Sequence, residues 1–360
     1  MKNNGLVSII IPTYNRADKI KKSINSVICQ TYPEWEIIVV DDASRDNTCE
    51  IVNEYMKKNI NIKYIKLDQN RGAANARNVG MKNSSGVYIA FLDSDDIWEN
   101  EHLKMNLDAM DEYGVKVSYS FWLERTLEGR NEDIFGAGKS LRIKFDRAVE
   151  DGFIKISDSQ VAFLKAPNYI EYACIHKVYC NHINTLVMNR DVYENIGLFD
   201  VGLITSEDDD YSFRILLKYD AVVVMKNLFI YHQGVDNLYN FVERENSDID
   251  KLLNERKIIN KFTIFLENNY KSIKKKQKAY LQYGNFNNKK KFLNACREQL
   301  GWRAFTIAYI NKELDIKKSL KYNLKSIWYM HRIVDLQLLL NIISRGRIYK
   351  AKNYKSYIHF

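Results

Sequence analysis

The sequence contains no CxxC pair, and its five cysteines are widely spaced along 360 residues. It therefore indicates neither a zinc site nor a disulfide framework, and we expect a reducing, cytoplasmic setting. No apolar run reaches the roughly 20 residues that are needed to span a bilayer. The first apolar run, Val7–Ile11, is too short for a secretory signal peptide and leads straight into Pro12.

The chain also lacks the two common glycine-rich phosphate-binding loops. No GxGxxG sequence follows the first apolar run, which argues against a nicotinamide or flavin dinucleotide site. No GxxxxGKS or GxxxxGKT sequence occurs, so a P-loop is absent. There is no internal repeat and no low-complexity linker.

Charge is distributed unevenly behind a formal net charge of +9. Residues 251–360 hold 25 Lys and Arg against 6 Asp and Glu, a net charge of +19, whereas residues 1–250 hold 29 against 39, a net charge of −10. A basic region of this kind suits an anionic surface. Because no nucleic-acid-binding module accompanies it and Trp and Tyr are interleaved with the lysines, we expect peripheral membrane binding and no nucleic-acid partner. The alternative is a helical appendage whose lysines are simply solvated.

Residues 6–120 alternate between strand-like and helical patterns. Apolar runs typical of strands occur at Val7–Ile11, Trp35–Val40, Ile62–Leu67, Val87–Leu92 and Val115–Tyr119. Helical periodicity occurs between them, at Ala17–Gln30, Asp46–Lys58, Gly72–Lys82 and Asn100–Tyr113. This alternation predicts a parallel sheet that is covered by helices on both faces.

The pattern is weaker beyond residue 120. Residues 121–170 have no clear period and are interpreted as a lid or an insertion. Strands are predicted at Thr185–Met188 and Ala221–Met225, and a short helix at Arg190–Ile196. Residues 245–360 are predicted to be helical throughout.

Acidic residues gather where predicted strands end. Asp41 and Asp42 follow the second strand, and Asp93, Asp95 and Asp96 follow the fourth. Two unit charges about 5 Å apart repel by roughly 3 kcal/mol at an effective dielectric constant near 20, so a cation would stabilise the second group. Oxygen ligands alone favour Mg²⁺ or Mn²⁺. The alternative for each group is a solvated turn that caps the next helix.

Five motifs stand along the chain: Val7–Arg16, Val39–Thr48, Asn70–Gly80, Phe91–Asp96 and Gly197–Arg214. Their order and spacing resemble the family 2 glycosyltransferases of the GT-A fold. The resemblance implies a Rossmann-like α/β domain over residues 1–240, with a mixed, mostly parallel sheet flanked by helices. The nucleotide-sugar half would cover about 1–120 and the acceptor half about 121–240, and the basic helical region, 245–360, lies outside the resemblance.

The resemblance also implies how the donor is bound. Pro12, Tyr14 and Asp42 would hold the nucleoside, most often uridine, and Arg77 would lie near the phosphates. Asp93 and Asp95 complete the implied nucleotide-sugar contacts.

A metal site is implied by the same resemblance. Asp95 would bind Mn²⁺ or Mg²⁺ at the diphosphate, and Asp93 would contact the ribose or a metal-bound water, with Asp96 nearby. His232, at the end of a strand-like run, is a further candidate ligand. His182 matches no zinc spacing and is expected in the core or the acceptor site.

One carboxylate is implied as the general base. Asp208 takes this role because it lies six residues before Arg214, although Glu207, Asp209 and Asp210 are neighbouring acids. The alternative for the whole run is an acidic helix N-terminus, which the helix dipole favours.

The implied activity is metal-dependent, inverting transfer of a sugar from a nucleotide-sugar, most often a UDP-sugar, to a glycan or lipid-linked acceptor. The implied setting is bacterial surface-polysaccharide or capsule assembly at the inner face of the membrane. Two alternatives remain open: a nucleotidyltransferase of related fold, and a non-catalytic protein that binds nucleotides or glycans.

Overall fold

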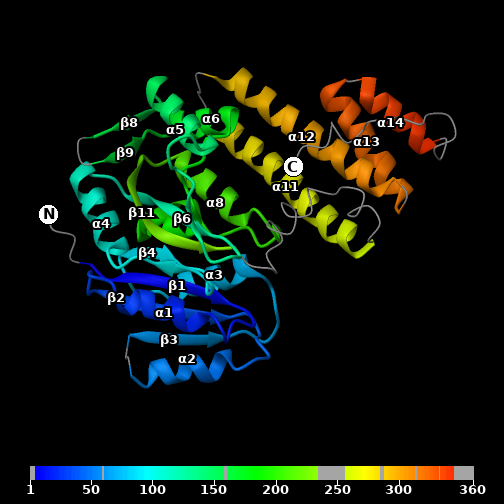
Figure 1. The fold of residues 1–360 in the computed structure, drawn as a ribbon. Helices are drawn as coiled ribbons and strands as arrows, with labels where there is room; N and C mark the ends of the chain where they lie inside the picture. Colours follow the sequence, from blue (N-terminus) through cyan, green and yellow to red (C-terminus); the bar gives the residue numbers. More distant parts are fainter. Residues whose placement is uncertain are drawn as a thin grey trace. The chain divides into compact units, whose positions relative to one another are not determined.

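The computed structural model describes residues 5–58, 61–157, 160–233, 256–283, 288–312, 314–331 and 333–343 (Figure 1). The chain divides into two compact units, Met1–Gln233 and Gly234–Phe360. The boundary that we expected at residues 240–245 falls outside the described residues.

The first unit is an α/β domain. Its described strands are β1 (Val7–Thr13), β2 (Trp35–Asp41), β3 (Ile62–Lys66), β4 (Tyr88–Phe91), β5 (Ile97–Trp98), β6 (Val117–Arg125), β7 (Asn131–Asp133), β8 (Ile154–Ile156), β9 (Val161–Leu164), β10 (Val187–Asn189) and β11 (Ala221–His232). Its helices are α1 (Ile20–Ile28), α2 (Thr48–Met56), α3 (Ala73–Lys82), α4 (His102–Tyr113), α5 (Ser140–Glu150), α6 (Asn168–His176), α7 (Arg190–Ile196) and α8 (Glu207–Leu216), with a short 3₁₀ helix, η1 (Ile183–Thr185).

The strands form one mixed sheet in the order β3-β2-β1-β4-β10-β6-β11-β9-β8. Pairing is parallel across β3, β2, β1 and β4 and again between β6 and β11, and antiparallel where β10, β9 and β8 join. The predicted mixed sheet is confirmed, but it is parallel over only part of its width. Because β1, β2 and β4 run parallel, their carboxyl ends meet at one edge, where ligands bind in sheets of this type.

Helix α3 lies unusually close to the sheet. It packs on β1 and β2. A Cβ atom on Gly80 would lie 2.4 Å from the Cγ2 atom of Ile10, so only glycine permits this approach. Arg77, nearly one turn earlier on α3, is thereby fixed just beyond the sheet edge.

The interpretation of residues 121–170 as an irregular lid or insertion is wrong. These residues extend β6, form α5 and supply β8 and β9 of the main sheet. Phe121 stacks on Phe135 with ring centroids 3.7 Å apart, and Phe145 packs edge-on against Phe121 at 5.5 Å. The strands in this region are only three or four residues long after β6, which is too short for a period to be recognised.

The second unit consists of helices in the part that the structure describes. They are α11 (Arg256–Gln282), α12 (Lys289–Asn311), α13 (Ile316–Met330) and α14 (Ile333–Ile343). The C-terminal half of α12 is buried on all sides and packs against α11 and α13, while α14 packs on α13. The helical prediction is confirmed for these residues, and residues 245–255 and 344–360 lie outside the described part. None of the described helices has the length and apolar character to cross a bilayer.

Candidate functional site

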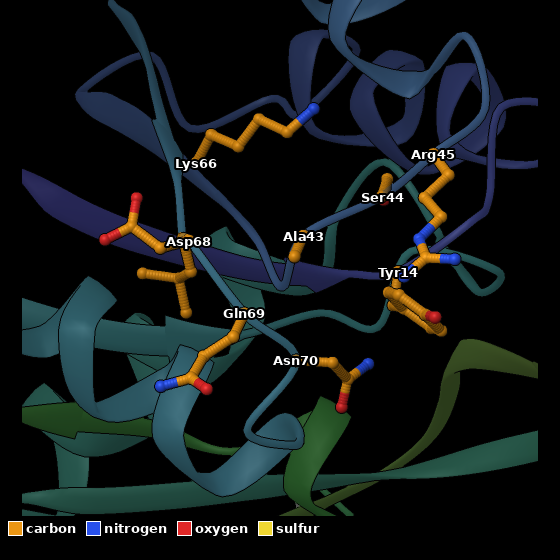
Figure 2. A pocket seen from close by; sticks show the side chains of 9 residues that line it. Tyr14, Ala43, Ser44, Arg45, Lys66, Asp68, Gln69 and Asn70 are labelled. Carbon is orange, nitrogen blue, oxygen red and sulfur yellow. The ribbon is translucent and has the colours of Figure 1, made fainter.

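A cavity of about 600 Å³ opens beyond the ends of β1, β2 and β3 (Figure 2). Its lining residues are Tyr14, Ala43, Ser44, Arg45, Lys66, Leu67, Asp68, Gln69 and Asn70. Tyr14 is 42% exposed, and its ring offers a flat apolar surface beside several hydrogen-bonding side chains. A cavity of this size and chemistry suits a small polar molecule with an aromatic part.

Hydrogen bonds between loops hold the cavity walls. The backbone N–H of Asn15 donates to the Ser44 hydroxyl at 2.8 Å, and the N–H of Arg45 donates to the Asn15 side chain at 2.9 Å. Asp41 accepts hydrogen bonds from the Ser44 N–H and from the Tyr64 hydroxyl. The loops after β1 and β2 are therefore joined to each other and to strand β3.

Pro12 and Asp42 support this cavity and do not line it. Pro12 is buried inside β1, opposite Val40 of β2. The carboxylate of Asp42 accepts the backbone N–H groups of Arg71 at 2.8 Å and Gly72 at 2.7 Å. Asp42 thus fixes the start of α3, and direct contact of either residue with a nucleoside stays a prediction.

The acidic turn after β4 is held by residues far away in the sequence. Asp93 accepts hydrogen bonds from Arg77 at 2.7 Å and from the Asn184 amide at 3.1 Å. Asp96 accepts the same amide at 2.9 Å and the backbone N–H of His232 at 2.8 Å. One amide group of η1 therefore holds two carboxylates of the turn together.

Arg77 joins the acidic turn to helix α8. Its guanidinium is almost fully buried and bonds Asp93 on one side and Glu207, at 2.9 Å, on the other. Burial by itself lowers the pKa of Arg77, but the carboxylates of Asp93, Glu207 and Asp208 raise it above its ordinary value. A permanently charged side chain therefore anchors both groups of acids, and Arg77 lies between them rather than out in the cavity.

The four acids at the start of α8 have different partners. Glu207 binds Arg77, and Asp210 binds Arg214 at 2.9 Å. Asp208 is partly exposed, and its one hydrogen bond among the described residues is from the backbone N–H of Asp209. Its carboxylate is thus available to accept a proton from a bound molecule.

The acidic turn carries more negative charge than its surroundings neutralise. Burial and the carboxylate of Asp93 raise the pKa of Asp95, although Arg16 at 3.3 Å and Lys19 at 4.0 Å oppose the shift. Burial and the carboxylates of Asp95 and Asp93 raise the pKa of Asp96 well above its ordinary value. An added cation would stabilise the ionised forms of both groups.

The residues of the acidic turn fit a divalent ion whose remaining ligands come from a bound molecule. In the described ranges, no three His, Cys, Asp and Glu side chains form a closed metal cage. Mg²⁺ and its analogues need only one or two carboxylates when substrate phosphates supply further oxygens. The side chains of Asp93 and Asp95 are 30% and 25% exposed. Because Arg77 and Asn184 already bind the Asp93 carboxylate, Asp95 is the more available of the two for such an ion.

His232 lies beside the turn but is engaged elsewhere. Its Nε2 atom is 3.3 Å from the Arg125 guanidinium, and its Nδ1 atom is 3.7 Å from Asp96. Since a guanidinium can only donate, Nε2 accepts and the proton of the neutral ring sits on Nδ1. This arrangement favours a structural role for His232, and its role as a metal ligand stays a prediction.

Sequence reasoning missed Asn184 entirely and left His182 with a general role. The ring of His182 packs on Trp122 and Phe229, with centroids 5.3 and 5.0 Å apart, and its Nδ1 accepts the Asn184 N–H. Burial lowers the pKa of His182 although the carboxylates of Asp208 and Asp93 oppose the shift. No local motif marks these residues, because their partners lie in distant segments.

We expect Asn184→Ala to weaken Mn²⁺ binding by about 10–100-fold, the usual cost of removing a group that orients a metal ligand. Calorimetry of Mn²⁺ binding with UDP present measures the change. Asn106→Ala is the matched control, because Asn106 is equally buried and binds His102 and Ser118 instead of the acidic turn. An equal loss of Mn²⁺ affinity in both variants would show that Asn184 acts only through general stability.

Comparison with known proteins identifies the first unit. Residues 8–147 match the model of the family described as glycosyl transferase family 2. The chain is 37% identical over 169 residues to the putative teichuronic acid biosynthesis glycosyltransferase TuaG of Bacillus subtilis, covering 45% of this chain and 66% of that protein. It is 46% identical over 114 residues to the Escherichia coli enzyme WfgD, a UDP-Glc:alpha-D-GlcNAc-diphosphoundecaprenol beta-1,3-glucosyltransferase, covering 32% and 44%. The chain thus spans under two thirds of one of these relatives and about two thirds of the other.

Solved structures share the fold. S. aureus TarS 1-349 in complex with UDP-GlcNAc aligns with a TM-score of 0.53 and 20% identity, over 96% of this chain and 93% of that one. The mannosyltransferase PcManGT from Pyrobaculum calidifontis, in complex with GDP-Man and Mn²⁺, aligns with a TM-score of 0.53 and 15% identity, over 98% and 84%. At these identities the likeness establishes the architecture.

Proposed function

We propose that this chain, which belongs to glycosyltransferase family 2, transfers a sugar from a nucleotide-sugar donor to a hydroxyl group of an acceptor. The observation that carries the proposal is the position of Arg77. It binds Asp93 of the acidic turn and Glu207 of α8, and so places the donor-side acids next to the helix that bears Asp208. Transfer needs these two groups of acids close together, because the bond to the leaving group breaks as the acceptor oxygen attacks.

The donor that we propose is a UDP-sugar. Tyr14 would stack on the uracil, and the hydrogen-bonding side chains that line the cavity would bind its edge and the ribose. Two names support this choice: TarS was solved with UDP-GlcNAc, and WfgD is named as a UDP-Glc enzyme. PcManGT binds GDP-Man, so a guanosine donor is the alternative.

Asp95 would hold Mn²⁺ or Mg²⁺ at the donor diphosphate, with Asp93 and Asp96 close by. When bound, such an ion neutralises the charge that develops on the leaving diphosphate. The raised pKa values of Asp95 and Asp96 support this assignment, since the turn lacks one positive charge. Arg77 is already engaged by two carboxylates and would keep Asp93 in place.

Asp208 would act as the general base. Its carboxylate would take the proton from the acceptor hydroxyl as the oxygen attacks the anomeric carbon. Attack from the side opposite the diphosphate inverts the configuration at that carbon. Glu207, whose pKa burial and Asp208 raise to about 7, would stay bound to Arg77 and hold the start of α8.

The acceptor that we propose is a glycan or a lipid-linked glycan in surface-polysaccharide synthesis. The names of TuaG and WfgD support this class, since one refers to teichuronic acid and the other to a diphosphoundecaprenol acceptor. A lipid-linked acceptor requires the enzyme to work at the inner face of the membrane, as a peripheral protein.

A thermal-shift panel of nucleotide-sugars with Mn²⁺ tests the proposed function. A ligand that binds only the folded protein raises the melting temperature, by an amount equivalent to about 2.7 kcal/mol at 100 times its Kd. We expect a UDP-sugar to give the largest rise and omission of Mn²⁺ to reduce it. A panel with no response to any nucleotide-sugar, or a response to nucleoside triphosphates alone, would contradict the proposal.

A further inference from the structure

Helices α13 and α14 expose large apolar side chains in a regular arrangement. On α13, Leu324 is 56% exposed and Trp328 is 67% exposed. On α14, the exposed apolar residues are Leu336, Leu340 and Ile343, at 51%, 47% and 63%. The two helices lie side by side, joined by hydrogen bonds from Asn323 and Ser326 to Asp335 (Figure 1).

Each set follows helical spacing and therefore forms one stripe. Leu324 and Trp328 are four residues apart, and Lys317 and Lys321 continue the same line towards the start of α13. On α14 the spacing of four and three residues repeats the pattern. The opposite sides of both helices are occupied by buried residues such as Tyr322 and Leu338. We call these two exposed lines the α13–α14 stripes.

We infer that the α13–α14 stripes form the surface by which this chain docks on an anionic lipid membrane. This inference rests on the proposed function, because a lipid-linked acceptor gives the enzyme a reason to be at a membrane. It goes further by assigning the contact to particular side chains. Leu and Ile would enter the boundary between headgroups and acyl chains, and Trp328 would lie at headgroup level.

The charge around the α13–α14 stripes favours an anionic membrane as their partner. Residues 316–343 contain five Lys and Arg and one acidic residue, Asp335, which is buried. Residues 344–360 add five more Lys and Arg in sequence and no Asp or Glu. Anionic lipid attracts such a region with a free energy that corresponds to about a fivefold gain in binding for each Lys or Arg near the surface.

Two other partners, a second copy of the chain and a nucleic acid, fit the α13–α14 stripes less well. A second copy of the chain would bring a like charge against this face, because residues 251–360 carry a net charge of +19. Nucleic acid binds through lysine and arginine contacts to phosphate and gains little from exposed Leu and Ile. Lipid is the partner that uses the apolar and the basic side chains together.

Some lysines of the basic helical region are not available to a membrane surface. Lys276 is buried on α11, and Lys325 is held between the rings of Tyr270 and Tyr322, 5.0 and 4.4 Å from their centroids. Lys317 and Lys321 are exposed in line with Leu324 and Trp328, and the Nζ atom of Lys321 also lies 6.0 Å from the centroid of the Tyr322 ring. The position of a lysine relative to the stripes should therefore matter more than the number of lysines.

Co-sedimentation of the full chain with vesicles tests the inference. We expect binding to vesicles that contain phosphatidylglycerol and weak binding to pure phosphatidylcholine. The triple variant Leu324→Ser, Trp328→Ser, Leu340→Ser should bind about tenfold more weakly, because the apolar contact is lost. The control is Leu281→Ser with Ile143→Ser, which removes apolar side chains of similar exposure elsewhere. An equal loss in both proteins would overturn the inference.

A second pair of variants tests the charge. Lys317→Gln with Lys321→Gln should weaken binding by about fivefold for each lysine, and Lys271→Gln with Lys278→Gln, which lie on α11, should weaken it less. Donor-dependent thermal shifts should be unchanged in all four variants, so failure of docking and failure of the proposed function remain distinguishable. If wild-type protein ignores anionic vesicles and light scattering shows that the triple variant turns a dimer into a monomer, the stripes bind a second copy instead.

Discussion

Asp208→Asn is expected to lower kcat by about 10²–10⁴-fold, the range that a positioned general base contributes. The amide keeps the shape of the side chain and its hydrogen bond to the Asp209 N–H, but it cannot take a proton from the acceptor hydroxyl. Donor binding should be preserved, because Asp208 is not a member of the acidic turn. Transfer assays and calorimetry with UDP, on the same preparation, separate the two effects.

Asp209→Asn is the control for this result. It changes the same charge one residue further along α8, at a side chain that we assign no part in transfer. We expect its kcat to stay close to that of the wild type. If Asp209→Asn lost as much activity as Asp208→Asn, the assignment of the base within the acidic run would be wrong.

Asp95→Ala is expected to remove the Mn²⁺-dependent part of UDP binding. Asp93 is already bound by Arg77 and Asn184, so the variant would remove the direct protein ligand that we propose for the ion. Loss of a group that merely orients a ligand costs about 10–100-fold in metal affinity, so loss of the ligand itself should cost at least as much. Calorimetry of UDP binding with Mn²⁺ and with a chelator measures, for each protein, how much Mn²⁺ increases the affinity for UDP.

Asp108→Ala serves as the control for Asp95→Ala, because Asp108 is an exposed carboxylate on α4 that pairs with Lys104. In this variant, Mn²⁺ should increase the affinity for UDP as much as it does in the wild type. The Asp95 variant loses the ion pairs with Arg16 and Lys19, but it also removes a carboxylate whose pKa burial and Asp93 raise. We therefore expect it to fold about as stably as the wild type. If Mn²⁺ increased the UDP affinity of Asp95→Ala as much as that of the wild type, the ion would be held elsewhere or not be used.

The local pattern of the sequence was sufficient to predict the elements that position the site. The predicted strands and helices of residues 6–120 are present, and acids at the ends of β2 and β4 lie at one sheet edge. Long, continuous apolar runs such as that of β1 give a strand signal that is easy to recognise. The short strands β8 and β9 do not, and β11 continues through a bulge near Asn227 that divides its apolar run in two.

The residues that hold the site in place could not be predicted from local sequence patterns. Asn184 reaches Asp93 and Asp96 across about ninety residues of sequence, and Arg77 reaches Glu207 across 130. Nothing within a few residues of Asn184 marks it, since the hydrogen bonds that define its role exist only after β10 has paired with β4. The sequence predicted which acids would perform the chemistry, and the folded structure shows which groups hold those acids in place.

We propose above all that the acidic turn after β4 holds a divalent ion at the diphosphate of the donor. The direct test is the anomalous diffraction of manganese in crystals soaked with Mn²⁺ and UDP. We predict a manganese peak within bonding distance of the Asp95 carboxylate and of diphosphate oxygens, with the uracil against Tyr14. UDP bound in the cavity with no manganese at the turn would contradict the account.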